Sequence, residues 1–576
     1  MKNNKRLANT AQIDNNIILT NDVMMSLNTR QTQRNLNVMI CGGSGTGKTR
    51  GYIIPNLLNA NTSFCITDPK GEIYASCATF LKRMGYKIKV FNIDEMLYSS
   101  NYNPFNYVYD SDGKLDYNSV KKMINVLMRN VGGGKENSGG DPFWDMSAEK
   151  LITAIAILLL EEGAKSQQNF AAVAEKMRAI EFPTDPKDVD FKSTLDREFE
   201  ALEAVNPESL GVLLYREFKQ GAGKTMKSVI SVANSKIQDF NLPSIKNLTH
   251  CDTLNLEKIG DEKTALFIII PASDTTFNFL AAMMYTQMFD LLYKRAFSRP
   301  EKRLSIHVRF LLDEYANVGQ IPDFDNLIST MRSVEISVSI ILQAVSQLKK
   351  LYEKSWETII ASCDSFLFLG GQEDTTLKLI SERLGKETID ITNRGRSRGR
   401  QSSTSLNDAL HGRELLTPDE VAKMDNRDCI LLVRGYPPFY SKKYNLLSHP
   451  NYMYSSLFSP EFIYDTRSVH TLLLPKQTPQ GKEKQRKKLH REPVGETINP
   501  VNQEIRIEIL KMKATETNML GGLKMKTFDH ATPRFEEVTV LEAGLIGIGG
   551  KLYDINAAGD KPTESEVHDD YYNIKN

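Results

Sequence analysis

The sequence predicts an α/β fold with a mostly parallel sheet, an inserted all-α domain and a flexible C-terminal tail. From residue 35, short apolar segments alternate with helical patterns, which is typical of parallel strands joined by crossover helices. From about residue 141 to 240 the apolar spacing is helical throughout, and apolar strands return at 264. After about residue 456 the sequence is polar and charged, as in a flexible tail.

These transitions divide the 576 residues into five segments. They are an N-terminal arm (1–34), the first part of the α/β domain (35–135), the inserted all-α domain (136–254), the second part of the α/β domain (255–455) and the C-terminal tail (456–576). The predicted strands are Asn35–Cys41, Thr62–Thr67, Tyr86–Asn92, Thr264–Ile270, Ser305–Leu312, Glu335–Leu342, Ser365–Leu369 and Cys429–Arg434.

Net charge, cysteine spacing and the length of apolar runs argue against a uniformly basic nucleic-acid-binding protein, a disulfide or zinc framework, and a membrane-spanning helix. The net charge is +1, so any contact with nucleic acid must come from local basic patches. The six cysteines are scattered, without the spacing of a zinc site or a disulfide framework, which indicates a reducing cytosol. The longest apolar run, Leu151–Leu160, is about half the ~20 residues of a membrane-spanning helix. It predicts a buried helix, and we expect that this chain does not itself cross a membrane.

The first chemical motif follows the first predicted strand. Residues 42–49 read Gly-Gly-Ser-Gly-Thr-Gly-Lys-Thr and match the phosphate-loop pattern G-x-x-x-x-G-K-[ST]. Glycines let successive N–H groups surround an anion, the lysine reaches the outer phosphates and the threonine hydroxyl ligates Mg²⁺. A strand before the loop and a helix from about Lys48 favour a site for ATP and Mg²⁺ over a simple Gly-rich turn. The candidate phosphate-binding residues are Gly42, Gly43, Ser44, Gly45, Thr46, Gly47, Lys48, Thr49 and Arg50.

A second motif lies at the end of the strand Ser305–Leu312. Asp313 and Glu314 follow that strand directly, where one carboxylate can order the Mg²⁺ shell and the other can polarise the attacking water. Taken alone, the pair fits a charged surface equally well. Asp313 lies 264 residues after Thr49, which is far more than a compact ATPase core needs. The helical stretch is therefore interpreted as an insertion into the sheet.

Three further candidates lie near predicted strand ends. Arg332 precedes the strand Glu335–Leu342 and can reach the γ-phosphate of a neighbouring subunit, or simply form a surface salt bridge. Gln343 ends that strand and can contact the γ-phosphate or the attacking water, or act as a polar strand cap. The loop after the second strand carries charged residues at a position where open α/β sheets place functional groups, with a plain turn as the alternative. These are Asp68, Lys70 and Glu72.

Other charged segments carry weaker signals. Gly221–Thr225 looks like a second phosphate loop, but Phe218 occupies the position of its first glycine and no strand precedes it. Arg394–Arg400 alternates arginine with small residues and is interpreted as an exposed mobile loop, with contact to a phosphate backbone as the alternative. The basic run Lys482–Lys488 and the acidic Lys561–Asp570 fit a solvated tail, with DNA or anionic lipid and a partner peptide as their respective alternatives.

Together these motifs resemble the conjugative type IV coupling proteins, the TraG/TraD-like group within the FtsK–HerA class of DNA-pumping ATPases. The resemblance covers about residues 36–450. The motifs that carry it are the phosphate loop at 42–49, Thr67–Glu72, Asp141–Trp144, Leu312–Tyr315, Arg332, Gln343 and Phe366–Gly371.

The resemblance implies a RecA-like P-loop ATPase that forms a homohexameric ring on the cytoplasmic side of the bacterial cell membrane. In this family ATP hydrolysis drives single-stranded DNA, with its attached relaxase, towards a type IV secretion channel. It implies as partners the relaxosome proteins, the channel ATPase and inner-membrane components. It also implies roles for six residues: Lys48 and Thr49 hold phosphates and Mg²⁺, Asp313 organises the metal shell, Glu314 activates water, Arg332 acts in trans and Gln343 couples hydrolysis to movement.

The sequence departs from the family pattern because it has none of the usual N-terminal transmembrane helices. A natural short form, a truncated product and a separate membrane anchor all remain open.

Two other functions also remain possible from the sequence. One is an FtsK/HerA-like translocase or helicase of chromosome processing, which the helical insert disfavours. The other is a nucleotide-gated receptor that docks relaxosome or effector proteins without pumping, which the intact ATPase residues disfavour.

Overall fold

The computed structural model divides the chain into two units, Met1–Pro475 and Lys476–Asn576. The residues described are 7–110, 112–131, 141–183, 191–221, 223–396, 404–464, 518–520 and 523–525. In the second unit they form one antiparallel pair, β14 (Asn518–Leu520) with β15 (Leu523–Met525). The charged runs Lys482–Lys488 and Lys561–Asp570 lie outside the described residues.

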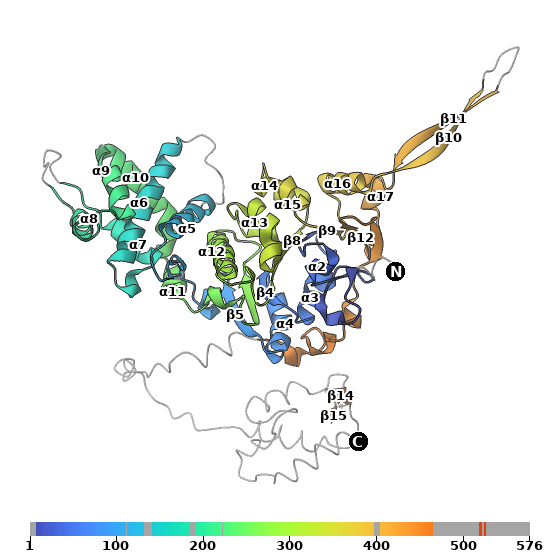
Figure 1. Ribbon diagram of the computed structural model, residues 1–576, viewed down its shortest axis with the longest axis horizontal. Helices are drawn as coiled ribbons and strands as arrows, with labels where there is room; N and C mark the ends of the chain where they lie inside the picture. Colours follow the sequence, from blue (N-terminus) through green and yellow to red (C-terminus); the bar gives the residue numbers. More distant parts are fainter. Residues whose placement is uncertain are drawn as a thin grey trace, which may run out of the picture. The chain divides into compact units, whose positions relative to one another are not determined.

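The first unit is built on a nine-stranded sheet (Figure 1). The strands in spatial order are β13 (Phe439–Lys442), β12 (Asp428–Val433), β9 (Ser365–Phe368), β3 (Val38–Cys41), β8 (Ile336–Leu342), β7 (Val308–Leu312), β4 (Ser63–Asp68), β6 (Thr264–Ile269) and β5 (Lys87–Asn92). All pairs from β9 to β5 are parallel, and β12 is antiparallel to both of its neighbours. The prediction of an α/β fold with a mostly parallel sheet is confirmed.

The central strands are apolar because both faces of the sheet are covered. All four residues of β3 and all seven of β8 are buried. Successive side chains of β3 enter opposite cores: Met39 and Cys41 join one cluster, whereas Val38 and Ile40 join the other. A continuous apolar run is what a parallel strand between two layers of helices requires.

One layer is formed by short elements close to β3 in sequence. It contains α3 (Ile54–Leu58) and α4 (Glu72–Arg83), which bury Leu57 and Leu81 against the sheet. The opposite layer contains α12 (Asn278–Phe297), α13 (Phe324–Thr330), α14 (Val345–Leu351), α15 (Trp356–Ala361) and α16 (Asp374–Leu384). Crossovers therefore cover both faces, as in doubly wound sheets.

The chain between β5 and β6 is helical. It forms α5 (Tyr117–Asn130), α6 (Pro142–Glu161), α7 (Phe170–Arg178), α8 (Thr194–Val205), α9 (Leu210–Lys219), α10 (Gly223–Ile237) and α11 (Pro243–Thr249). Helices α6–α10 gather at one side of the unit in Figure 1. Residues 151–160 of α6 are all buried, as the apolar run predicted. No helix within the described ranges is both long and apolar enough to span a membrane.

Both ends of the α/β domain extend further than the sequence predicts. The segment 7–34, interpreted as a polar arm, forms β1 (Asn16–Ile18), β2 (Met24–Ser26) and α2 (Thr29–Thr32). Its Ile17 and Met25 side chains are fully buried in the core that contains α3 and α4. Residues 456–464 run along α4, where the Tyr464 N–H donates to the Ala75 carbonyl. The apolar residues of these segments are isolated and show no helical or strand periodicity. The sequence pattern therefore did not predict that the segments are part of the domain.

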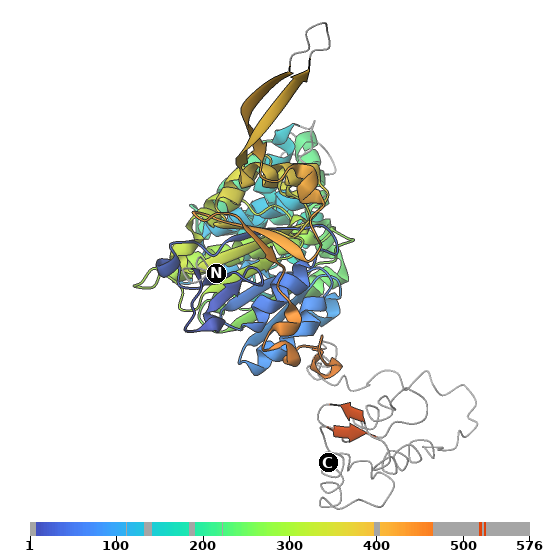
Figure 2. The same ribbon diagram turned by 90° about the vertical axis from the view of Figure 1, so that its right-hand side faces the viewer.

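A long hairpin replaces the mobile loop expected at Arg394–Arg400. Strands β10 (Lys386–Arg396) and β11 (Thr404–Glu414) pair over eleven residues, from Lys386 with Glu414 to Arg396 with Thr404. It extends away from the sheet in both Figure 1 and Figure 2. Arg394 and Arg396 therefore belong to a strand, which corrects the loop prediction, whereas 397–400 fall outside the described residues. The β-branched residues of 388–392 were the overlooked signal.

Candidate nucleotide-binding site

Strand register brings the predicted motifs to one edge of the sheet. In the β3–β8 pair, Cys41 lies opposite Leu342, and in the β7–β8 pair, Leu312 lies opposite Ile340. The residues that follow these strands are the phosphate loop, Asp313 and Gln343. Parallel strands place their carboxyl ends at the same edge, so the phosphate loop meets there two segments that lie at least 264 residues later in the chain.

A pocket of about 550 Å³ opens at this edge. All the predicted site residues line this pocket, with the exception of Gly42, Gly43 and Arg332. The residues that line it are Ser44, Gly45, Thr46, Gly47, Lys48, Thr49, Arg50, Asp68, Pro69, Lys70, Glu72, Ile73, Ala272, Asp313, Glu314, Asn317, Gln343 and Gln347.

The phosphate loop depends on its glycines for both conformation and space. Gly45 and Gly47 have φ angles of 73° and 88°, in the left-handed region that favours glycine. A Cβ atom at Gly42 would lie 2.5 Å from the Thr46 hydroxyl oxygen. That hydroxyl donates to the Gly43 carbonyl at 2.8 Å and closes the loop. The Gly43 N–H donates to the Gly370 carbonyl after β9 at 2.9 Å, which ties the loop to the neighbouring strand.

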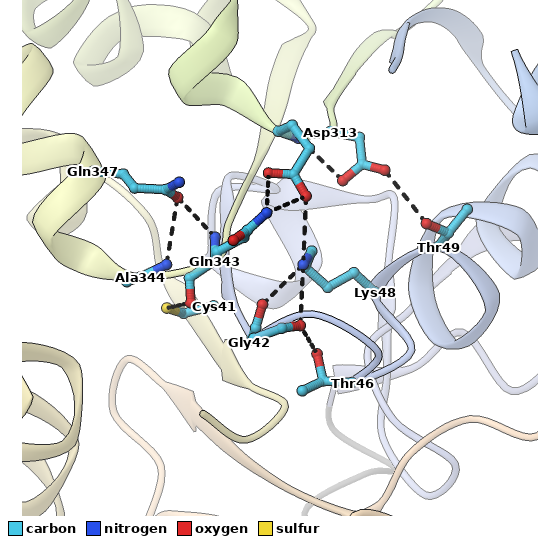
Figure 3. Close-up of polar contacts among 11 residues, drawn as sticks. Cys41, Gly42, Thr46, Lys48, Thr49, Asp313, Gln343, Ala344 and Gln347 are labelled. Atoms are coloured by element: carbon cyan, nitrogen blue, oxygen red, sulfur yellow. Dashed lines mark hydrogen bonds and ion pairs between the residues drawn. The ribbon is translucent and has the colours of Figure 1, made fainter. Parts of the chain in front are cut away.

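Lys48 lies inside the loop, as Figure 3 shows. Its ammonium group donates to the Gly42 and Gly43 carbonyls at 2.9 and 3.2 Å and lies 3.6 Å from a Glu314 carboxylate oxygen. The side chain is 9 % exposed, so the cation is held at the base of the pocket rather than in solvent. An ammonium so placed can contact a phosphate oxygen that enters from the open side.

The helix after the loop begins with a wide turn. Residues Thr49–Ile53 form a π-helical turn before α3, where the sequence predicts a helix from Lys48. Such turns are rare and occur often at functional sites. The Thr49 hydroxyl donates to an Asp313 carboxylate oxygen at 3.4 Å. A hydroxyl and a carboxylate form the oxygen donor set that Mg²⁺ prefers, so these two residues fit the predicted metal site.

The two carboxylates of the Asp-Glu pair differ in their surroundings. Burial, and then the Glu314 charge, raises the pKa of Asp313 to about 6. A cation at this position would lower that pKa again. Glu314 adopts a left-handed conformation with φ of 47°, and both its oxygens accept hydrogen bonds from the Gln343 amide at 3.1 and 3.0 Å. Gln343 therefore holds Glu314, the residue predicted to activate water.

The loop after β4 contributes one buried and two exposed charges. Asp68 accepts the Tyr74 N–H at 2.8 Å and the Lys70 N–H at 3.4 Å, so its carboxylate organises the start of α4. Burial raises the pKa of Asp68 to about 6. Lys70 and Glu72 are exposed and face the pocket.

Arg332 is not part of this pocket. It lies in the turn Met331–Val334, before β8, whereas Gln343 follows the other end of the same strand. Its guanidinium donates to the Thr29 carbonyl at 2.7 Å. Arg332 therefore sits at the opposite edge of the sheet from its own subunit's phosphate loop, and a role at a nucleotide requires a second subunit.

Several residues around the pocket gave no clear signal in the sequence. Gln347 accepts the Gln343 N–H at 2.9 Å, and its spacing of four residues from Gln343 could have indicated it. Lys443 donates to the Thr46 carbonyl at 2.8 Å from 397 residues away, which no local pattern predicts. The fully buried Arg309 donates to the Tyr52 hydroxyl at 2.8 Å and to Asn56 at 2.9 Å, linking β7 to the turn after the phosphate loop.

Comparison with known protein families gives one match that covers most of the chain. Residues 1–476 match the family described as Type IV secretory system Conjugative DNA transfer. Protein VirD4 of Rhizobium radiobacter is 22% identical over 413 residues, which are 70% of this chain and 56% of that protein. Conjugal transfer protein TraG of the same species is 22% identical over 405 residues, which are 69% of this chain and 60% of that protein. The chain thus spans less than two thirds of the length of these relatives.

Solved structures show the same fold. The bacterial conjugative coupling protein TrwBdeltaN70, in an unbound form, aligns with a TM-score of 0.53 at 17% identity, over 78% of this chain and 92% of that one. Plasmid coupling protein TrwB in complex with ADP and Mg²⁺ aligns with a TM-score of 0.53 at 16% identity, over the same shares. At this identity the likeness establishes the RecA-like fold.

Proposed function

Since the chain belongs to the conjugative DNA-transfer family of type IV secretory systems, we propose that it is the coupling ATPase that moves single-stranded DNA towards the secretion channel. The family resemblance seen in the sequence is thereby confirmed. The observation that carries the proposed activity is the arrangement of Lys48, Asp313, Glu314 and Gln343 in one pocket. A receptor that only docks partners has no need of a water-activating carboxylate held in place by an amide.

The proposed reaction divides its tasks among these residues. The phosphate loop and Lys48 bind the β- and γ-phosphates, and Glu314 accepts a proton from the attacking water. Thr49 and Asp313 would hold Mg²⁺, which, when bound, neutralises charge on the phosphates. Gln343 donates to Glu314, so a γ-phosphate that competes for its amide would release the carboxylate for catalysis.

The proposed partners follow from the family. They are single-stranded DNA, the relaxase and its relaxosome, the secretion-channel ATPase and inner-membrane components, with the protein acting as a homohexamer at the cytoplasmic face of the membrane. The proposed role of Arg332 requires assembly, because the residue lies on the edge opposite its own subunit's phosphate loop and donates there to the Thr29 carbonyl.

Hydrolysis measured with and without single-stranded DNA tests the function. We expect several-fold stimulation by DNA that weakens as salt rises, because phosphate contacts release counterions. Double-stranded DNA at equal phosphate concentration is the matched control for the alternative chromosome translocase. Near-zero hydrolysis that DNA leaves unchanged, in a verified oligomer, would contradict the motor and favour a docking receptor.

Arg332→Ala subunits mixed with Lys48→Ala subunits test the role in trans. Each variant alone should be inactive, whereas randomly mixed rings should recover up to about a quarter of the wild-type rate, because some intact phosphate loops then face an intact Arg332. Arg303→Ala, at a half-buried surface arginine of the same region, serves as the control and should stay active. An absence of recovery in rings shown to be mixed would count against catalysis in trans.

A further inference from the structure

The first helix after β5, α5, contacts the helical insertion (α6–α10) near its own first residue. The helix lies between α6 and α12 (Figure 1). Its Tyr117 hydroxyl donates to the Glu161 carboxylate at the end of α6. The Ser209 hydroxyl, just before α9, donates to the same carboxylate at 2.6 Å. One end of α5 is therefore attached to two helices of the insertion.

The other end of α5 is fixed to the loop that follows Glu314. The Gln320 N–H donates to the Asn130 side-chain oxygen at 2.8 Å, and the Asn130 amide donates to the Gln320 carbonyl at 3.0 Å. Gly319 permits this approach, because its φ is 93° and a Cβ atom there would lie 2.6 Å from the Asn130 oxygen. Asn130, Gly319 and Gln320 thus form a clasp, here named the Asn130 clasp.

The helix between these two attachments is rigid enough to connect them. Its fourteen residues span roughly 20 Å at 1.5 Å per residue. α12 supports it along its length, where the Lys122 ammonium lies 2.9 Å from an Asp290 carboxylate oxygen. α12 also reaches the same loop, because the Asn278 amide donates to the Asn317 carbonyl. The loop after Glu314 is therefore held by both helices.

The loop itself is short and internally fixed between Glu314 and the clasp. Gln320 lies six residues after Glu314. Tyr315 is fully buried, and its hydroxyl shares a hydrogen bond of 2.8 Å with the Tyr352 hydroxyl. The Ile321 N–H donates to the same Tyr352 hydroxyl at 3.0 Å. Because one side chain holds both ends of this loop, a shift at Gln320 also shifts the residues next to Glu314.

A pocket of about 440 Å³ lies beside the Asn130 clasp. All three residues of the clasp line it, and it shares Asn317 and Gln347 with the nucleotide pocket. A close-packed interior resists displacement, whereas a hollow leaves room for the loop to move on this side. The clasp is therefore placed where a small movement of α5 can reach the nucleotide pocket.

We infer that Asn130 is a positioning residue that couples the helical insertion to the ATPase site, through α5 and the loop that follows Glu314. This inference rests on the proposed ATPase function and adds a regulatory connection to it. Coupling of binding is reciprocal, so a ligand of the insertion changes the affinity for nucleotide by the same factor as nucleotide changes the affinity for that ligand.

Steady-state kinetics of the full chain test the positioning role. We expect Asn130→Ala to lower kcat by about 10- to 100-fold, the scale for a reacting group displaced by about 1 Å. The KM for ATP should not change, because the phosphate loop is untouched. Asn125→Ala is the matched control. Asn125 is a half-buried asparagine of the same helix without a side-chain hydrogen bond to the part of the chain that the structure describes, and its variant should keep the wild-type kcat.

Gly319→Ala disrupts the clasp from its other side. The added methyl group collides with the Asn130 oxygen, so a similar loss of kcat is expected. The double variant Asn130→Ala/Gly319→Ala should lose no more than the weaker-acting of the two single variants, because both substitutions remove the same contact. Losses that multiply would show that the two residues act independently, and would overturn the inference.

Hydrogen–deuterium exchange distinguishes coupling from a purely structural attachment. On addition of the non-hydrolysable ATP analogue ADPNP with Mg²⁺, we expect exchange in the wild-type chain to change at the phosphate loop and also in α6. In Asn130→Ala the change at the phosphate loop should persist, whereas the change in α6 should be lost. Thermal unfolding establishes that the compared chains are folded, and Gly319→Ala takes the place of Asn130→Ala if the latter is not.

The pattern of responses separates the inference from the function on which it rests. An α6 response of equal size in the wild type and in the variant overturns the inference and leaves the ATPase proposal intact. The same holds for a wild-type chain that responds at the phosphate loop but not in α6. A wild-type chain without any response at the phosphate loop overturns the proposed function, and the inference with it.

Discussion

Lys48→Ala is expected to lower the steady-state rate of ATP hydrolysis by at least about 100-fold, the usual cost of removing one charge-stabilising donor. The ammonium group lies inside the loop, 2.9 Å from the Gly42 carbonyl, where it can contact a phosphate oxygen. Alanine leaves the loop without a cation while the negative charge of Glu314 remains. Initial rates at saturating ATP and Mg²⁺ measure the effect.

The chain provides its own matched control for this substitution. Lys224 lies in Gly-Ala-Gly-Lys-Thr, a sequence that imitates the phosphate loop, but Lys224 itself belongs to the helix α10, which comes after the helix α9 in the chain. Lys224→Ala should leave hydrolysis at the wild-type rate, because no strand edge positions that lysine. Loss of activity in Lys224→Ala, or its retention in Lys48→Ala, would contradict the assignment of the site.

Glu314→Gln is expected to reduce the turnover number by about 10²- to 10⁴-fold, the usual contribution of a general base. The substitution keeps the size of the side chain and removes its ability to accept a proton from water. Binding of ATP should persist, because Lys48 and the loop are unchanged. Single-turnover hydrolysis and a separate binding measurement distinguish the two effects, since only the first should change.

Glu72→Gln is the control for lost charge alone. Glu72 lines the same pocket from the first turn of α4, so its substitution removes one negative charge from the pocket lining. Its hydrolysis rate should stay close to wild type. Equal losses of hydrolysis rate in the Glu314→Gln and Glu72→Gln variants would show that the electrostatic field of the pocket, rather than proton transfer to Glu314, controls the rate.

The parts of the fold and of the site that could be predicted are those that short, contiguous stretches of sequence determine. Strands β3, β7 and β8 are short apolar runs, and each is followed directly by predicted functional residues. The apolar runs predicted the strands, and the motifs that follow them predicted the site. Their meeting at one edge follows from parallel pairing alone. The residue roles in this pocket stay predictions, supported by the contacts of Lys48, Thr49, Glu314 and Gln343.

The features that escaped prediction depend on contacts between distant segments. The hydrogen bond from Lys443 to Thr46 bridges 397 residues, and no spacing in the sequence announces it. The buried segment 7–34 acquires its structure from α3, where Asn56 accepts the Ile18 N–H at 2.9 Å. The hairpin β10–β11 was obscured because its arginines and glycines resemble a loop when read without its pairing partner.

The central position of β3 has a consequence for synthesis of the chain. This strand pairs with β8 and β9, whose residues lie about 300 positions later. At about 5–20 residues per second, a ribosome needs roughly 15–60 s to supply those neighbours, and both edges of an apolar strand stay unpaired until then. The emerging N-terminal third therefore cannot assemble its nucleotide pocket, and it exposes a strand of the kind that chaperones shield from aggregation. Nucleotide becomes a stabilising ligand only after nearly the whole first unit has left the ribosome.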